Sequence, residues 1–201
     1  MLAIIEAAGW PIWLLLFTSV IAVALIIERS ISLRRPRIIP ASLLKTVIGE
    51  IQSRGQSEDM NRRLEMHSPL GRIFSAALRN SGQSREVMKD AVEDAGRAVS
   101  NELGMFLTTL GTIASMSPLL GLFGTIVGMI EIFGSATAAG NDPQVLAHGI
   151  SVALYNTGFG LMIAIPSMIF YRHFRALVDS FLIEMEQQAI HLVELLHGER
   201  R

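Results

Sequence analysis

The run from Leu103 to Ile130 contains no Asp, Glu, Lys or Arg. A helix needs about 20 predominantly apolar residues to cross the hydrocarbon core of a bilayer, and this run is longer. It also contains Gly121, Gly124 and Gly128. Small residues three or four positions apart let a second helix approach closely in a membrane, where the hydrophobic effect does not drive helices together. We therefore predict a membrane-spanning helix that packs against protein.

Basic residues are confined to two segments of the chain. Every Lys and Arg lies between Arg29 and Arg97 or between Arg172 and Arg201, whereas residues 1–28 and 98–171 contain none. Under the positive-inside rule the basic segments are cytoplasmic. This distribution predicts an all-α membrane protein with three transmembrane helices, its N-terminus outside and its C-terminus inside.

Composition excludes several other classes of protein. Half of the residues are hydrophobic and 17% are charged, a low share for a soluble domain. The net charge of −1 disfavours a nucleic-acid binder, and the lack of Cys rules out disulfides and thiolate chemistry. The His residues are scattered and no metal or phosphate-loop motif occurs. We expect no enzyme active site, no metal and no cofactor.

The first span is predicted from Trp10 to Ile27, with Trp10 and Trp13 at its outer interface. The alternative is a cleaved signal peptide, which needs a basic start and a small-residue cleavage site. Neither pattern is present, so we interpret this segment as a retained anchor.

The remaining pattern is helical. Helices are expected from Ala41 to about Ser53 and, after a Ser68 cap, from Pro69 to about Asn80. No breaker follows Arg85, which predicts one continuous helix to about Phe133, roughly 70 Å long and kinked at Pro118. The third span should continue inward as an amphipathic helix, and both inward extensions should pack with residues 41–80 in a cytoplasmic bundle.

These expectations divide the chain into six segments. They are an outer N-terminus with the first span (1–28), a cytoplasmic helical region (29–104), the second span (105–133), a short periplasmic loop (134–146), the third span (147–171) and a cytoplasmic C-terminal helix (172–201).

Small and hydroxyl-bearing residues recur at helical spacing on the second and third spans, which predicts one such face on each helix. The second span has Thr108, Thr112, Ser115, Pro118, Gly121, Thr125 and Gly128, and the third has Gly149, Ala153, Thr157, Gly160, Ala164 and Ser167, with Asn156 beside them. From the residues alone, the hydroxyls either line a path or bond their own backbone one turn back.

Three segments resemble the two characteristic membrane helices of the ExbB/TolQ/MotA proton-channel family. They are Pro118–Met129, Ala153–Thr157 and Gly160–Pro166. The resemblance implies a ring of identical subunits, a pentamer in this family, in a Gram-negative inner membrane. The ring would surround an ExbD-like or TolR-like partner whose single span carries an Asp, and a TonB-like protein would pass on the work.

The resemblance assigns roles to individual residues. Thr125 and Thr157 match the family's polar pore positions, and we expect Asn156, Ser115 and Thr112 to line the path with them. Asn156 is equally compatible with a purely structural bond between helices. Helix packing and partner contact are expected from Pro118, Gly121, Gly124, Gly128, Ala153, Gly160 and Pro166.

One expected residue is missing. Many ExbB and TolQ sequences have a Glu five residues before the third-span Thr, where this chain has Val152. Proton transfer through a membrane normally needs an intramembrane carboxylate. The chain is therefore expected to form the wall of the channel, while a partner supplies the Asp that titrates. A TolQ-like or gliding motor, or a scaffold without ion flux, stays open; a flagellar stator is disfavoured because that group usually has four spans.

Two groups of charges have alternative interpretations. Glu28 and Arg29 mark either a membrane boundary or a specific contact. Glu93, Asp94 and Arg97 form either a solvated helix face or a cluster at the channel's inner mouth.

Overall fold

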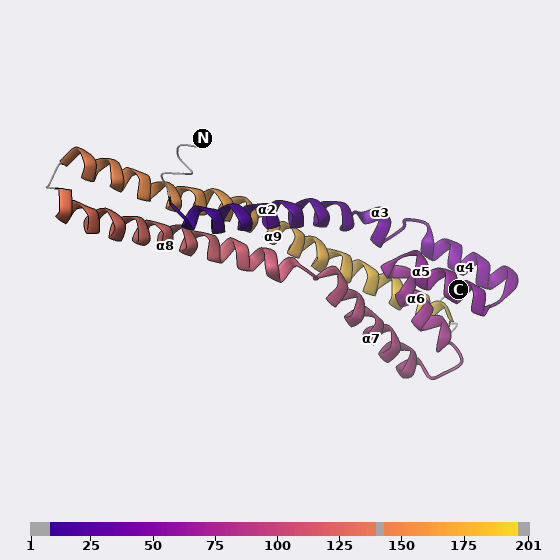
Figure 1. The fold of residues 1–201 in the computed structure, drawn as a ribbon. Helices are drawn as coiled ribbons and strands as arrows, with labels where there is room; N and C mark the ends of the chain where they lie inside the picture. Colours follow the sequence, from indigo (N-terminus) through magenta and orange to yellow (C-terminus); the bar gives the residue numbers. More distant parts are fainter. Residues whose placement is uncertain (1–8, 140–142, 197–201) are drawn as a thin grey trace. The chain divides into compact units, whose positions relative to one another are not determined.

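The structure is a computed structural model that describes residues 9–139 and 143–196. The helices of this described part, labelled in Figure 1, are α2 (Pro11–Ser32), α3 (Arg35–Ile38), α4 (Leu43–Arg54), α5 (Glu58–His67), α6 (Pro69–Arg79), α7 (Arg85–Leu103), α8 (Leu107–Ala139) and α9 (Pro143–Leu196). The described residues include no strand. The chain divides into a first unit, residues 1–29 and 106–173, and a second unit, residues 30–105 and 174–201.

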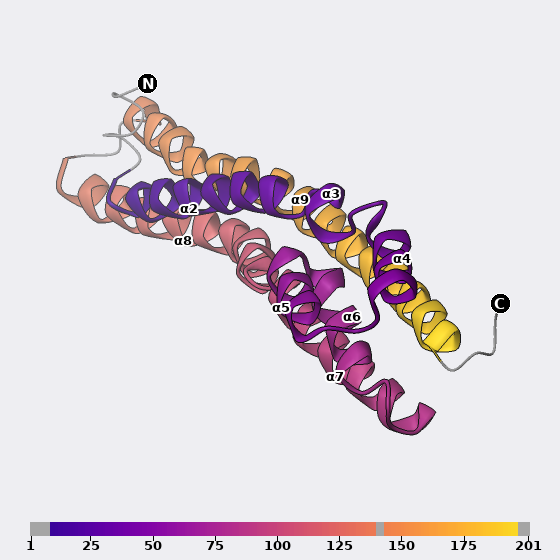
Figure 2. The same cartoon turned by 90° about the vertical axis from the view of Figure 1, so that its right-hand side faces the viewer.

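The first unit consists of α2, α8 and the first part of α9, which run side by side in both views (Figures 1 and 2). One face of α2 is buried through Ile12, Leu15 and Ala22. The opposite face exposes large apolar side chains, among them Trp13, Phe17, Val20, Val23 and Ile27. Such a surface is stable against lipid tails and costly in water.

Within the described residues, three stretches are long and apolar enough to cross a membrane: Pro11–Ser32, Arg85–Gly134 and Gly149–Leu196. They contain the three spans that the sequence predicts. The all-helical fold and the number of apolar helices are therefore confirmed, and α9 continues without interruption from the third span into the second unit.

The prediction of one continuous helix from Arg85 to Phe133 is wrong. Helix α7 ends at Leu103, the chain turns through Gly104–Phe106, and α8 begins at Leu107. Phe106 has φ 65°, in the left-handed region that residues with a Cβ rarely adopt. Because the backbone reverses its twist there, the helical hydrogen-bond ladder cannot continue.

A contact from α2 accompanies this break. The Arg29 guanidinium lies 5.4 Å from the centre of the Phe106 ring, close enough for a cation–π attraction. Arg29 is buried although it is charged, and its guanidinium binds both carboxylate oxygens of Glu28. The helical pattern from Arg85 onward contains no hint of this contact, because its partner lies in a different helix.

The predicted loop at 134–146 is shorter than expected. Helix α8 continues to Ala139 and α9 already begins at Pro143; residues 140–142 lie outside the described part. The segment after Gly134 is rich in Ala, the strongest helix former, and Pro suits the first turn of a helix.

The second unit contains α3 to α7 and the end of α9. Helix α6 packs against α3, α5 and α7, and buries Leu70, Ile73, Phe74, Ala77 and Leu78. The expected helices at 41–53 and 69–80 correspond to α4 and α6. Helices α3 and α5 were not predicted; α5 has a strongly polar sequence in which three buried residues, Met60, Asn61 and Leu64, supply its inner face.

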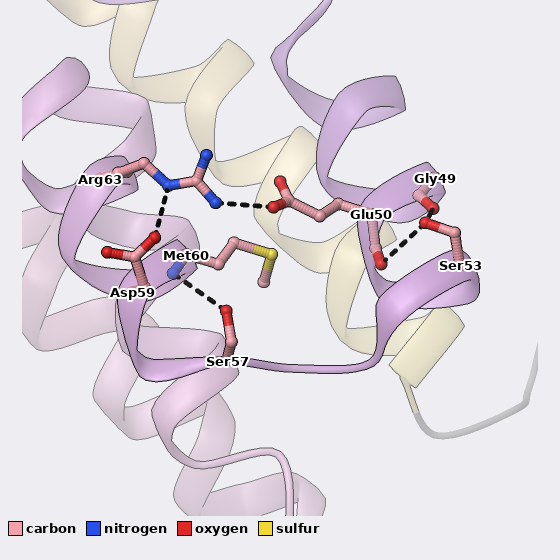
Figure 3. A network of polar contacts seen from close by, with 7 residues as sticks. All are labelled: Gly49, Glu50, Ser53, Ser57, Asp59, Met60 and Arg63. Atoms are coloured by element: carbon pink, nitrogen blue, oxygen red, sulfur yellow. Dashed lines mark hydrogen bonds and ion pairs between the residues drawn. The ribbon is translucent and has the colours of Figure 1, made fainter.

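Arg63 links two consecutive helices of the second unit (Figure 3). Its Nη2 atom lies 2.7 Å from Glu50 Oε1 on α4, and its Nε atom lies 3.2 Å from Asp59 Oδ2 on α5. Ser57 caps α5 by accepting a hydrogen bond from the Met60 amide at 3.2 Å. The short α4–α5 connection is thus fixed by polar contacts at its surface.

We expect Ser68→Ala to lower the stability of the second unit by about 1–2 kcal/mol, the upper part of the usual range for an N-cap. The Ser68 hydroxyl accepts from the Gly71 amide at 3.1 Å in a buried site, so its loss leaves that amide without its cap. Ser84→Ala is the control, because Ser84 caps α7 in an exposed position at 3.4 Å. Thermal unfolding should show the larger loss for Ser68→Ala; equal losses would contradict this account.

Candidate functional site

Helices α8 and α9 approach most closely at Gly121 and Gly160. A Cβ atom added to Gly121 would lie 2.7 Å from the Asn156 carbonyl oxygen, and one added to Gly160 would lie 2.5 Å from the Ser117 carbonyl oxygen. The two glycine Cα atoms are themselves neighbours across the contact. Because the obstacles are backbone atoms, no side-chain adjustment could make room for a larger residue.

The contact continues along both helices. A Cβ on Gly124 would meet the Asn156 side chain at 2.8 Å, and one on Gly128 would meet the Ala153 Cβ at 3.2 Å. Ala153 is 2% exposed. The structure therefore brings the predicted small residues of the two spans together in one interface.

Thr125 and Thr157 meet inside this interface. Their hydroxyl oxygens are 2.6 Å apart, and either hydroxyl can donate. The Thr125 hydroxyl also lies 3.1 Å from the carbonyl oxygen of Ala153 and 3.2 Å from that of Gly121. Both Thr residues are half-buried. The two side chains thus form a polar pair between helices that are otherwise apolar. The Thr125 hydroxyl is within hydrogen-bond distance of atoms of α9 as well as of the backbone of its own helix.

Two other polar side chains of the contact between α8 and α9 are fully enclosed. Asn156 and Ser117 are both 0% exposed, and the Ser117 hydroxyl donates to the Ile113 carbonyl at 2.7 Å. Asn156 packs against Gly124. Ser117 precedes Pro118, whose missing N–H interrupts the backbone ladder of α8 at this level.

Two of the predicted path residues lie elsewhere. Thr112 and Ser115 are exposed, and their hydroxyls donate to backbone carbonyls of α8 itself. On α8 the exposed Thr112 and Ser115 do not share the buried face of Gly121, because residues three or four apart drift around a helix over several turns; Leu110, Ile113 and Ala114 in the same stretch are buried. The place of Thr112 and Ser115 in a path stays a prediction. Pro166 is also exposed, on α9.

Two contacts of this unit were not anticipated. Tyr171 lies against Gly111, where an added Cβ would be 3.0 Å from its ring. Trp10 packs edge-on against Phe123, with ring centroids 6.0 Å apart. Gly111 belongs to the same small-residue pattern as Gly121, so its spacing was a usable signal for the first contact.

The described membrane segments contain few carboxylates. Between Leu107 and Tyr171 the sequence has only Glu131 and Asp142, and Glu131 is exposed. Val152 is half-buried one residue before Ala153. The Thr pair therefore has no acidic neighbour along the described parts of these helices.

The two groups of charges occupy different environments. Glu28 and Arg29 form the partly buried ion pair described above, with the Arg29 guanidinium over the Phe106 ring. Arg97 pairs with Glu93 at 2.5 Å and with Asp94 at 3.8 Å on the exposed surface of α7. Exposed ion pairs of this kind contribute little to stability. The choice between a solvated helix face and an inner-mouth cluster stays a prediction.

The three apolar helices define a multi-pass membrane protein. Its second and third spans pack through glycines and enclose a pair of Thr hydroxyls. The sequence matches the model of the MotA/TolQ/ExbB proton channel family over residues 65–187. The chain belongs to this family.

Relatives carry both ExbB and TolQ names. The chain is 35% identical over 179 residues to a putative ExbB-like biopolymer transport protein of Synechocystis, a match of 86% of this chain and 84% of the relative. It is 49% identical over 67 residues to biopolymer transport protein exbB1 of Vibrio cholerae, covering 32% of this chain and 28% of that protein. It is 38% identical over 108 residues to the Tol-Pal system protein TolQ of Pseudomonas aeruginosa, covering 51% and 47%. The chain thus spans less than half of the latter two.

We expect Gly160→Ala to separate α8 from α9 and to destabilise the first unit by about 1–3 kcal/mol, the usual cost of overpacking. The added methyl would lie 2.5 Å from a backbone oxygen. Gly158→Ala is a matched control two residues away, because a Cβ there meets nothing within 4 Å. The melting temperature in detergent should fall for Gly160→Ala alone, and an unchanged value would show that the interface is looser than described.

Proposed function

We propose that this chain is the channel-wall subunit of a proton-driven motor in a bacterial inner membrane. Identical copies form a ring, a pentamer by analogy with the family, and the ring surrounds a single-span ExbD-like or TolR-like partner. The N-terminus is periplasmic, and the second unit, with its basic residues, is cytoplasmic. The family membership and the names of the relatives support this assignment.

The observation that carries the proposal is the Thr125–Thr157 pair. Two hydroxyls 2.6 Å apart, within an interface made of Gly and Ala, place hydrogen-bonding groups in an apolar layer. Polar groups inside membrane helices are costly and mark ion or substrate paths. In the ring, the pairs of successive subunits form a belt of hydroxyls around the partner helix.

The partner supplies the group that titrates. Hydroxyl groups can accept and donate hydrogen bonds, but they do not exchange protons at neutral pH as a carboxylate does. The intramembrane Asp of the partner takes a proton from one side and releases it on the other, while the Thr pairs stabilise it in passing. Alternate protonation drives rotation of the partner relative to the ring.

The work produced goes to a TonB-like protein and from there to an outer-membrane transporter. The ExbB names among the relatives favour this use. The TolQ relative, at 38% identity, favours a second candidate, an envelope-integrity motor with the same ion path. The two candidates differ in the partner that the ring accepts.

The assembly is tested by native mass spectrometry of the detergent-purified chain, expressed alone and together with an ExbD-like or a TolR-like single-span protein. We expect a closed ring that takes up partner chains, and the accepted partner distinguishes the two motors. A ring that takes up neither partner would support the non-conducting scaffold that Val152 suggests.

We expect Thr157→Val to leave assembly intact and to reduce proton flux in vesicles that contain the complex. Valine has nearly the same shape, and Thr125 can still donate to the Ala153 or Gly121 carbonyl. Only the hydroxyl pair is lost. Flux is measured with a pH-sensitive dye after a potassium diffusion potential is imposed.

Thr18→Val is the control for this substitution. Thr18 lies on α2, is half-buried like the two Thr residues of the pair, and donates to the Leu14 carbonyl of its own helix at 2.7 Å. The substitution Thr18→Val therefore removes a hydroxyl from a membrane helix without changing the Thr125–Thr157 pair. Normal flux in Thr157→Val, or an equal loss in Thr18→Val, would remove the Thr pair from the mechanism.

A further inference from the structure

Basic side chains gather where the chain leaves α2. Arg34, Arg35 and Arg37 follow the end of this helix at Ser32, and all three are exposed. The sequence contains no Asp or Glu between Arg29 and Glu50. This short segment therefore carries positive charge that no acidic residue of its own balances.

The segment is held in place by apolar anchors. Leu33, Ile38 and Ile39 are 3%, 2% and 2% exposed, and α3 packs against α6. Each basic side chain thus projects from a backbone that is fixed to the second unit. A fixed set of guanidinium groups loses less conformational entropy on binding than the same groups on a flexible tail.

Two of the three arginines make no ion pair in the part of the chain that the structure describes. Arg35 binds Glu184 with 2.8 Å between Nη2 and Oε1, whereas Arg34 and Arg37 have no acidic partner there. Arginines farther along the second unit mostly do pair, for example Arg72 with Glu102 and Arg79 with Glu65. Arg34 and Arg37 thus place two exposed positive charges, without an ion pair among the described residues, directly after the end of a membrane helix.

The depth of these residues follows from the rise along α2. The apolar run ends at Ile27, and the five residues to Ser32 add about 8 Å at 1.5 Å per residue. The polar headgroup layer on each side of a bilayer is roughly 5–8 Å thick. By this measure Ser32 reaches the outer edge of the headgroup layer, and the long side chains of Arg34 and Arg37, which follow directly, can extend back toward the lipid phosphates.

We propose that Arg34 and Arg37 bind the phosphate of an anionic phospholipid headgroup in the leaflet at this end of α2. The planar guanidinium fork matches the geometry of phosphate oxygens, and basic clusters next to a membrane helix attract anionic lipids. The inference depends on the membrane helix and not on the proposed motor function, so it holds for a motor and for a scaffold.

The test is a titration of the detergent-purified full chain with phosphatidylglycerol and, separately, with phosphatidylcholine, with bound states resolved by native mass spectrometry. We expect tighter binding of phosphatidylglycerol. The variant Arg34→Gln/Arg37→Gln should weaken that binding about fivefold for each arginine removed. The variant Arg34→Lys/Arg37→Lys should bind with an affinity between those of the original chain and the Gln variant, because the charge stays while the guanidinium fork is lost.

The matched control is Arg62→Gln/Lys89→Gln, which removes the same charge from exposed positions on α5 and α7. It should leave the preference for phosphatidylglycerol unchanged. Unaltered binding in Arg34→Gln/Arg37→Gln, or an equal loss in the control, would overturn the proposal. So would full displacement of the lipid by inorganic phosphate, which would identify a free-anion site.

Discussion

The close contact between α8 and α9 is the constraint on which the membrane part depends. In lipid, two helices gain nothing from hiding apolar surface, so they stay together only where their atoms fit closely. Gly121 and Gly160 permit that fit because a methyl on either one would strike backbone of the opposite helix. The Thr125–Thr157 distance, the burial of Asn156 and the position of Ala153 all follow from it.

The sequence was sufficient for the parts of the fold that local physics determines. Long charge-free runs predicted the three apolar helices, and the Ser68–Pro69 pair predicted the start of α6. The spacing of Gly121, Gly124 and Gly128 predicted a face that packs against protein. In each case the residues that carry the signal also make the contact, so no distant partner had to be known.

The largest error arose where the local structure depends on a residue far away in the sequence. The break at Gly104–Phe106 involves a Phe with positive φ beneath the Arg29 guanidinium, and nothing near Phe106 in the sequence reveals that partner. Helix α5 was missed because three inward residues are too few to produce a clear period. Thr112 and Ser115 were grouped with Gly121 on one helix face because helical spacing tolerates a slow rotation, which over several turns moves a residue to another face; their place in the path stays a prediction. The roles of Thr125 and Thr157 stay predictions.

The hydroxyl pair has an electrical consequence. Thr125 has one proton and lies within reach of the Thr157 oxygen and of two carbonyl oxygens, and either member of the pair can be the donor. Rotating the two O–H bonds exchanges donor and acceptor while every heavy atom stays where it is. The contact between α8 and α9 therefore contains a small dipole whose direction can reverse inside a rigid frame, and it can follow the sign of a nearby charge without any movement of the helices.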